Sequence, residues 1–146
     1  MSRSRCKPQK KIDELLLLIT IYAYVKENGF APSAGSLMEM KSQFAPSLTR
    51  IDTLRMWLKR KTNRTVRRVN KWRPYRYELN RQGKKRIVFL VKRALRKATL
   101  LKQLDPVYAY RVYPNMFQLY SIAKELAETY KERNLLFNLF MQYLST

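Results

Sequence analysis

The sequence predicts a mainly helical protein that carries one small β-hairpin. Apolar residues recur at helical spacing through most of the chain, and residues 62–79 interrupt this pattern with β-branched and aromatic residues around a turn-forming NKWRP stretch. Apolar residues make up 46% of the 146 residues, which is enough to form a core. Capping residues, turn-forming residues and apolar periodicity predict the individual elements.

Two helices open the chain. An almost wholly apolar helix is expected over residues 13–28, because Asp13 favours the positive end of the helix dipole and Gly29 fits the position after the last turn. Ser33 is then expected to cap a short helix that runs to Lys41.

The third helix and the hairpin come next. A turn over residues 42–45 leads to a helix over residues 46–61, because Pro46 fits the first turn of a helix. Its apolar stripe leaves a polar face on the opposite side. The hairpin is expected over residues 64–79, with its tip at residues 71–73.

The last part of the chain predicts three more helices. Asn80 caps a long helix that ends near residue 102 and has a basic side opposite its apolar stripe. The remaining expected elements are an irregular, tyrosine-rich connector over 105–114, a helix over 115–131, a break over 132–134 and a helix over 135–144.

Positive charge is concentrated in the middle third of the chain. The protein holds 31 Lys and Arg against 10 Asp and Glu, a net charge of +21. Residues 50–102 hold twenty of these basic residues and only two acidic ones, whereas residues 103–146 hold four of each sign. These positive charges repel one another unless an anion neutralises them. They are distributed over several predicted elements, whereas a membrane-binding protein would carry them on one amphipathic helix. The pattern favours nucleic acid over a membrane as the partner.

The composition excludes most catalytic and metal chemistry. The chain has no His and a single Cys, Cys6, so an internal disulfide, a cysteine-rich zinc site and the usual general base are ruled out. The acidic residues do not cluster as a two-metal site requires. We expect no enzyme, no cofactor, no metal and no small-molecule ligand.

The apolar run at residues 15–25 has no cleavage site after it and is too short to span a bilayer. This favours a cytoplasmic, nucleoid-associated or virion protein over a secreted or membrane protein.

The order of elements over residues 12–102 resembles that of winged helix-turn-helix DNA-binding proteins. The YRYELNRQG segment at residues 75–83 looks like the ending of the second wing strand in such proteins, with Asn80 where Thr or Ser is usual. The basic, Tyr-rich and His-free composition is reminiscent of DNA-binding proteins from archaea and their viruses. The resemblance implies that the helix at 46–61 enters the major groove and that the hairpin at 64–79 is a wing.

The resemblance also implies two sets of DNA-contacting residues. The base-reading residues are Ser47, Thr49, Arg50 and Thr53. The phosphate and wing residues are Arg55, Lys59, Arg60, Lys61, Arg64, Arg67, Arg68, Lys71, Trp72, Arg73, Arg76, Lys84 and Lys85. Other roles stay open for some of them. Thr49 and Thr53 also fit plain solvent-facing positions. Arg50 fits an ion pair with Asp13, and Trp72 fits a core position that covers the hairpin.

We expect three parts: a basic arm over residues 1–11, a nucleic-acid-binding domain over 12–102 and a helical extension over 103–146. The apolar stripes of the extension favour a homodimer, since a two-fold protein reads a palindromic site; a monomeric helical cap is the alternative. The favoured function is a transcriptional regulator that binds double-stranded DNA. The alternatives are a structural nucleoprotein that packages DNA without sequence specificity and an RNA-binding factor.

Overall fold

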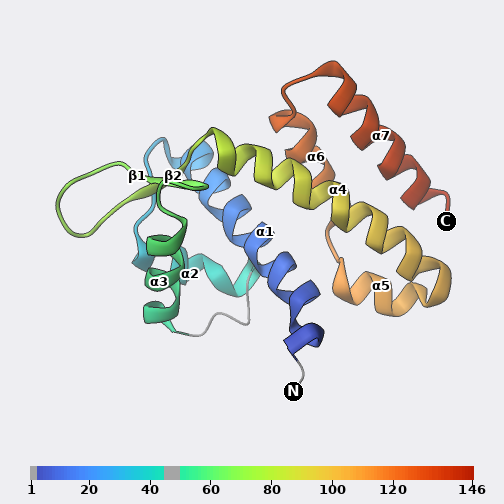
Figure 1. The fold of residues 1–146 in the computed structure, drawn as a ribbon, viewed down its shortest axis with the longest axis horizontal. Helices are drawn as coiled ribbons and strands as arrows, with labels where there is room; N and C mark the ends of the chain where they lie inside the picture. The colour runs from blue at the N-terminus through green and yellow to red at the C-terminus, as the bar shows by residue number, and fades with distance from the viewer. Residues whose placement is uncertain (1–2, 45–49) are drawn as a thin grey trace. The chain divides into compact units, whose positions relative to one another are not determined.

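The computed structural model describes residues 3–44 and 50–146, with side chains from residue 14 to 40 and from residue 50 onwards. The described chain is mainly helical and contains one two-stranded antiparallel sheet, which confirms the fold class at this level (Figure 1). It divides into two compact units, Met1–Arg86 and Ile87–Thr146. The predicted boundary at residue 102 falls inside a helix that continues to Leu104.

The first unit contains three helices, the hairpin and the start of a fourth helix. Its elements are α1 (Arg3–Asn28), α2 (Ala34–Phe44), α3 (Ile51–Lys61), β1 (Val66–Arg68), β2 (Tyr77–Leu79) and the first turns of α4 (Arg81–Leu104). Helix α2 packs against both α1 and α3, and β2 packs against α1. The core is formed by fully buried aliphatic side chains from these helices and from β1, including Leu18, Ile21, Leu37, Leu54, Leu58 and Val66.

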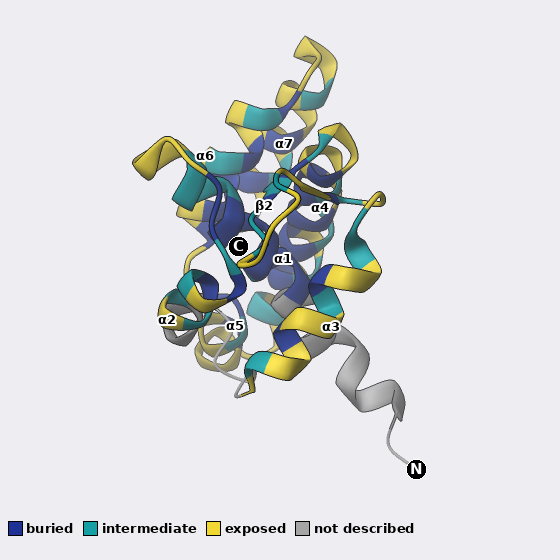
Figure 2. Ribbon diagram, turned by 90° about the vertical axis from the view of Figure 1, so that its left-hand side faces the viewer, coloured by how far each residue is buried: buried dark blue, intermediate teal, exposed yellow. Residues whose placement is uncertain are grey.

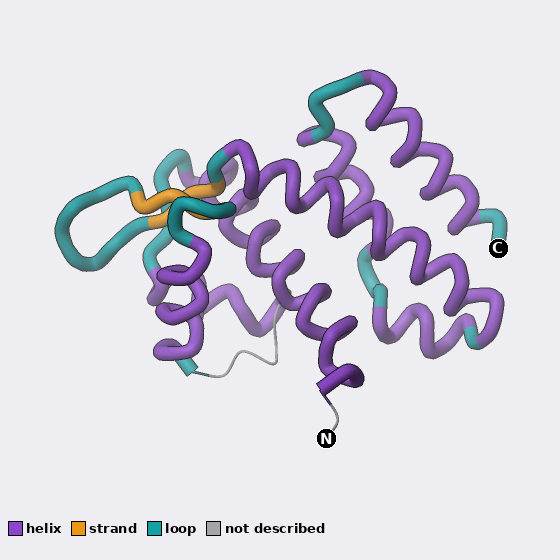
Figure 3. Tube along the Cα trace, viewed as in Figure 1, coloured by secondary structure: helices purple, strands orange, loops and turns teal. Residues whose placement is uncertain are grey.

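The hairpin is short and has a long connecting loop. Val66 pairs with Leu79, and Arg67 pairs with Glu78. Val66 and Leu79 are buried, so the strands attach to the core at this end. The loop over residues 69–76 extends away from the helices of this unit (Figure 3).

The hairpin is also fixed to its neighbours through the backbone. The amide of Tyr77 donates to the carbonyl oxygen of Pro32 at 2.9 Å, which joins β2 to the loop before α2. At the other end of β2, the side-chain oxygen of Asn80 accepts from the amide of Gly83 at 2.8 Å and caps α4, as predicted. Gly83 lies so close to the carbonyl oxygen of Thr65 that a Cβ there would overlap it.

The second unit is entirely helical. It contains the rest of α4, α5 (Pro106–Val112), α6 (Met116–Leu126) and α7 (Tyr130–Leu144). The rings of Tyr120 and Phe140 stack at 4.3 Å between centroids and join α6 to α7. Lys92 pairs with Glu132 at 3.3 Å, which joins α4 to α7.

Three helix boundaries in the first unit differ from those predicted. Helix α1 begins at Arg3, so residues 3–11, expected as an arm, belong to it; their Lys, Arg and Gln residues favour helix, whereas Pro8 opposes it. Helix α2 continues to Phe44, so the expected turn over 42–45 is wrong for residues 42–44. Helix α3 begins at Ile51 rather than residue 46, and Pro46 lies outside the described residues.

Two predictions for the second unit are wrong. Residues 106–112 form α5 instead of an irregular connector, because the Asp105 carboxylate accepts from the amide of Tyr108 at 3.1 Å and Pro106 follows at the first helical position. The break between the last helices lies at 127–129 rather than 132–134. There the hydroxyl of Thr129 accepts from the amide of Glu132 at 3.1 Å and starts α7.

Candidate nucleic-acid interface

Helix α3 has one buried side and one exposed side. Leu54 and Leu58 are fully buried, whereas Met56 lies at the centre of the opposite side and is 64% exposed. Figure 2 shows the alternation of buried and exposed colouring along this helix. Thr53 and Arg60 flank Met56 on the exposed side, as the predicted periodicity requires. The helix therefore presents a polar and basic surface to solvent.

Two of the four predicted base-reading residues lie at the start of this surface. Arg50 is the residue before α3, has extended backbone angles and is exposed, and Thr53 lies one turn further on and is also exposed. Ser47 and Thr49 lie outside the described residues. Asp52, which lies between Arg50 and Thr53 in sequence, is exposed and pairs with Arg55 at 3.7 Å.

Most of the predicted phosphate and wing residues are exposed. The exposed members are Arg55, Lys59, Arg60, Arg64, Arg67, Arg68, Lys71, Trp72, Arg73, Lys84 and Lys85, whereas Lys61 and Arg76 are half-buried. All of them belong to the first unit. Trp72 is 82% exposed, so its alternative assignment to the core is wrong.

Several of these basic side chains have protein partners that the sequence did not predict, and three of these contacts bear on the proposed site. Lys61 pairs with the buried Glu14 carboxylate at 3.4 Å. The Arg67 side chain donates to Glu78, with Nε at 3.1 Å from Oε1. Arg76 donates to the carbonyl oxygen of Ala31 at 2.9 Å. Each is therefore less available to a phosphate than it would be without this protein partner.

The Arg67–Glu78 pair depends on the register of the hairpin. A three-residue tip at residues 71–73 would place Arg67 opposite Tyr77, whereas the observed register, shifted by one residue, places it opposite Glu78, where opposite charges attract. The Arg76 contact had no sequence signal, because Ala31 belongs to a different part of the chain.

The hairpin loop is held by one side chain. The amide nitrogen of Asn70 donates to the carbonyl oxygens of Trp72 and Pro74, both at 3.0 Å, and its oxygen accepts from the amide of Arg76 at 2.8 Å. These three bonds span the loop and fix its backbone. The sequence predicted only that Asn70 forms part of a turn; an Asn at the start of a long hairpin loop is the signal for this role.

Tyr75 organises two arginines of the hairpin. The guanidinium carbons of Arg68 and Arg73 lie 4.3 and 5.8 Å from the centroid of its ring, which is cation–π distance. The neighbouring Tyr77 is buried, and this burial raises the pKa of its hydroxyl above the usual value near 10, while Arg68 acts in the opposite direction. Tyr77 is therefore a neutral core residue at physiological pH.

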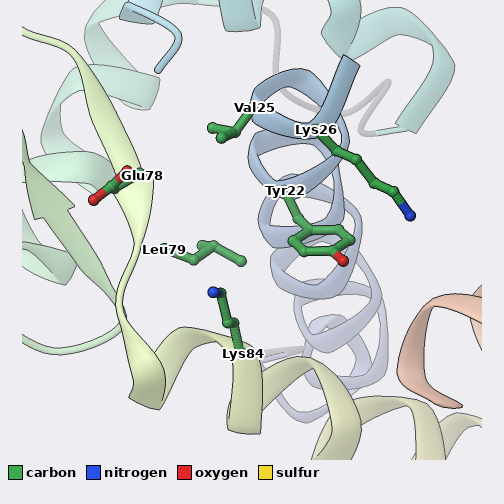
Figure 4. A pocket seen from close by; sticks show the side chains of 6 residues that line it. All are labelled: Tyr22, Val25, Lys26, Glu78, Leu79 and Lys84. Carbon is green, nitrogen blue, oxygen red and sulfur yellow. The ribbon is translucent and has the colours of Figure 1, made fainter. Parts of the chain in front are cut away.

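The first unit has one small surface pocket among those described, and it is a poor ligand site. Its volume is about 210 Å³, below the roughly 300 Å³ at which small-molecule sites begin. Figure 4 shows its lining side chains, which come from α1, β2 and the start of α4: Tyr22, Val25, Lys26, Glu78, Leu79 and Lys84.

Within the described ranges, no three His, Cys, Asp or Glu side chains come together as a metal site would require. None of the helices in those ranges combines the length and apolar character needed to cross a membrane.

Comparison of the chain with protein-family models, with curated proteins and with solved structures finds no match.

Proposed function

We propose that this protein binds double-stranded DNA in the manner of a winged helix-turn-helix protein, with α3 in the major groove and the hairpin loop on the neighbouring backbone. The observation that supports this most is the gathering of exposed basic side chains on three consecutive elements of one unit: α3, the turn after it and the hairpin. A transcriptional regulator is the role that this arrangement fits best.

The exposed side of α3 has the chemistry of a base-reading surface. The major groove of B-DNA admits one α-helix, and the helix end that faces the bases carries Arg50 and Thr53. Arginine matches the two acceptors of guanine, and the hydroxyl of threonine bonds to several bases. Met56 supplies an apolar contact for a thymine methyl group.

Six exposed cations of the first unit are the candidates for phosphate contacts: Lys59, Arg60, Arg64, Lys71, Arg73 and Lys84. If all six contact phosphates, the slope of log K against log salt is about −5, since each contact contributes roughly −0.9. A titration of a fluorescent duplex at several salt concentrations measures this slope.

A pair of charge-matched variants localises the interface. Replacing Lys59, Arg60 and Arg64 together by Ala is expected to make the slope less negative by about 3. Replacing Lys124, Lys131 and Arg133, three exposed basic residues of the second unit, leaves it unchanged. Equal effects of the two triple variants, or no binding of the wild type at low salt, would refute the proposal. Duplex RNA is expected to bind more weakly, because its deep major groove does not admit a helix.

We also propose that residues 103–146 form a homodimer through α7. Helix α7 carries a stripe of exposed residues that are spaced alternately four and three positions apart: Tyr130, Asn134, Phe137, Met141 and Leu144. This is the spacing of the a and d positions of a coiled coil, with Asn134 at a position where Asn commonly fixes the register. Because these residues belong to the charge-balanced third of the chain, two copies can meet there without the repulsion of the basic segment.

A structural nucleoprotein is the second candidate. The observation in its favour is that the first unit has further exposed basic residues at the start of α4, at Arg81 and Lys85, in addition to those of α3 and the hairpin. Such a protein binds all duplexes alike, so the sequence preference of the protein distinguishes the two candidates.

A further inference from the structure

We infer that Trp72 stacks on a DNA base, and that the hairpin loop thereby inserts an aromatic ring at an opened base step of the bound duplex. The inference rests on the proposed DNA binding and adds to it a specific contact and a preferred kind of site: a duplex in which one step is easily unstacked.

The loop presents the tryptophan in a fixed position. Asn70 bonds to the carbonyl oxygen of Trp72 itself and to the backbone of Pro74 and Arg76. The backbone that carries the ring is therefore ordered before any ligand arrives, so less conformational entropy is lost when the ring makes a contact. The side chain nevertheless has 82% of its surface exposed.

The charge around the ring favours a polyanion. Lys71 and Arg73 flank Trp72 and are both exposed, and the sequence of residues 69–76 holds no acidic residue. An exposed tryptophan is also common at protein–protein interfaces. Here its immediate neighbours are cations, which hold a phosphate on either side of a base that stacks on the ring.

Insertion of a side chain between base steps is a known way to bend DNA. It costs the unstacking of one step, and this cost is lowest where the base is mismatched. A loop that ends in one aromatic ring between two cations has the components for this contact: the ring replaces the lost stacking, and the cations hold the separated phosphates.

The test uses Trp72 as its own probe. The protein has two tryptophans, Trp57 and Trp72, so W57F leaves Trp72 as the only one. Two duplexes of the same length and charge are added, one perfectly paired and one with a central mismatch. We expect quenching of the Trp72 fluorescence by both duplexes, with tighter binding and stronger quenching for the mismatched one.

Substitution at residue 72 then isolates the ring. W72A is expected to weaken binding to the mismatched duplex about tenfold and to abolish the preference for it, because a base stacked on an aromatic side chain contributes roughly this much. W72F retains most of the preference. Y110A, which removes an exposed aromatic ring from α5, outside the α7 stripe, leaves both affinities unchanged.

The outcomes separate the inference from the proposal beneath it. If both duplexes bind but the Trp72 fluorescence is unchanged and W72A binds like the wild type, the stacking inference is wrong and DNA binding stands. If neither duplex binds at low salt, both are wrong.

Discussion

The guanidinium of Arg86 donates two hydrogen bonds to the buried carboxylate of Glu14, at 3.0 and 3.3 Å. Lys61 reaches the same carboxylate at 3.4 Å. Glu14 lies on α1, Lys61 ends α3 and Arg86 lies on α4, so one carboxylate joins the three helices of the first unit that carry or border the proposed DNA surface. Two of the many cations in the basic segment therefore hold the fold together.

Removal of Arg86 is expected to destabilise the protein more than removal of an exposed arginine. R86A leaves the Glu14 carboxylate buried with less compensation, which we expect to lower the free energy of unfolding by about 2 kcal/mol. R111A, at an exposed position, changes it by less than about 0.5 kcal/mol. Urea unfolding measures both.

A double variant checks that the effect comes from the pair. E14Q with R86A is expected to cost less than the sum of the two single changes, because the second change removes a partner that the first has already lost. Additive costs would show that the two side chains do not stabilise the fold together.

Replacing glycine by alanine is expected to change the stability of the fold in opposite directions at two helical glycines, Gly83 and Gly35. In G83A the added Cβ overlaps the carbonyl oxygen of Thr65, and since backbone must shift to make room, the free energy of unfolding falls by at least about 1–3 kcal/mol. In G35A the atom nearest to the added Cβ is the Ser33 hydroxyl oxygen, at 3.8 Å, so the methyl group fits. The higher helix propensity of Ala is therefore expected to raise the free energy of unfolding by about 0.5–1 kcal/mol. Thermal and urea unfolding of both variants test this. A stable G83A would mean that the start of α4 is not packed against the hairpin.

Two arginines of the hairpin are expected to contribute differently to DNA binding. Arg73 is exposed and lies in the loop, whereas Arg67 already pairs with Glu78. R73A should weaken binding to all duplexes alike and make the salt slope less negative by about 1. R67A should change the slope by much less than R73A does, because Glu78 already neutralises Arg67. A larger effect of R67A would mean that DNA displaces Glu78 or that the loop does not reach the backbone.

The α7 stripe is expected to set the oligomeric state. F137E places a charge in the middle of the proposed interface, so the protein should sediment as a monomer while the wild type sediments as a dimer. V107E introduces the same charge at an exposed position of α5, outside the stripe, and should leave the dimer intact. A monomeric wild type at micromolar concentration would rule out the dimer.

Local signals in the sequence predicted much of the fold. Ser33 and Asn80 cap the helices expected of them, because a cap is a hydrogen bond between residues three positions apart and the sequence shows both partners. The hairpin was predicted because β-branched and aromatic residues lie on both sides of a turn-forming stretch. The start of α5 carried a comparable signal in Asp105 and Pro106, but the tyrosines after it were interpreted as an irregular segment.

The sequence did not predict which basic residues are used inside the protein. Glu14 lies 47 positions from Lys61 and 72 from Arg86, and no periodic pattern links residues that far apart. Their contact depends on how the helices pack, so Lys61 was assigned to DNA. For the candidate site, the sequence therefore identified the charged segment, and the structure separated its exposed cations from its paired ones.

Sequence reading by α3 is expected to depend on Arg50 and Thr53. Replacing both by Ala should relax the preference among duplexes, because each good base contact discriminates by roughly 1–3 kcal/mol. R111A, which removes an arginine from the second unit, is the control and keeps the preference.

Base reading by α3 is tested most directly by selection of a random duplex library by the purified protein at physiological salt, followed by sequencing of the bound pool. We expect a short enriched motif, arranged as an inverted repeat if α7 forms the dimer, and its loss in the R50A/T53A variant. A bound pool with no enriched sequence, released steeply as salt rises, would contradict base reading by α3 and favour a protein that packages DNA.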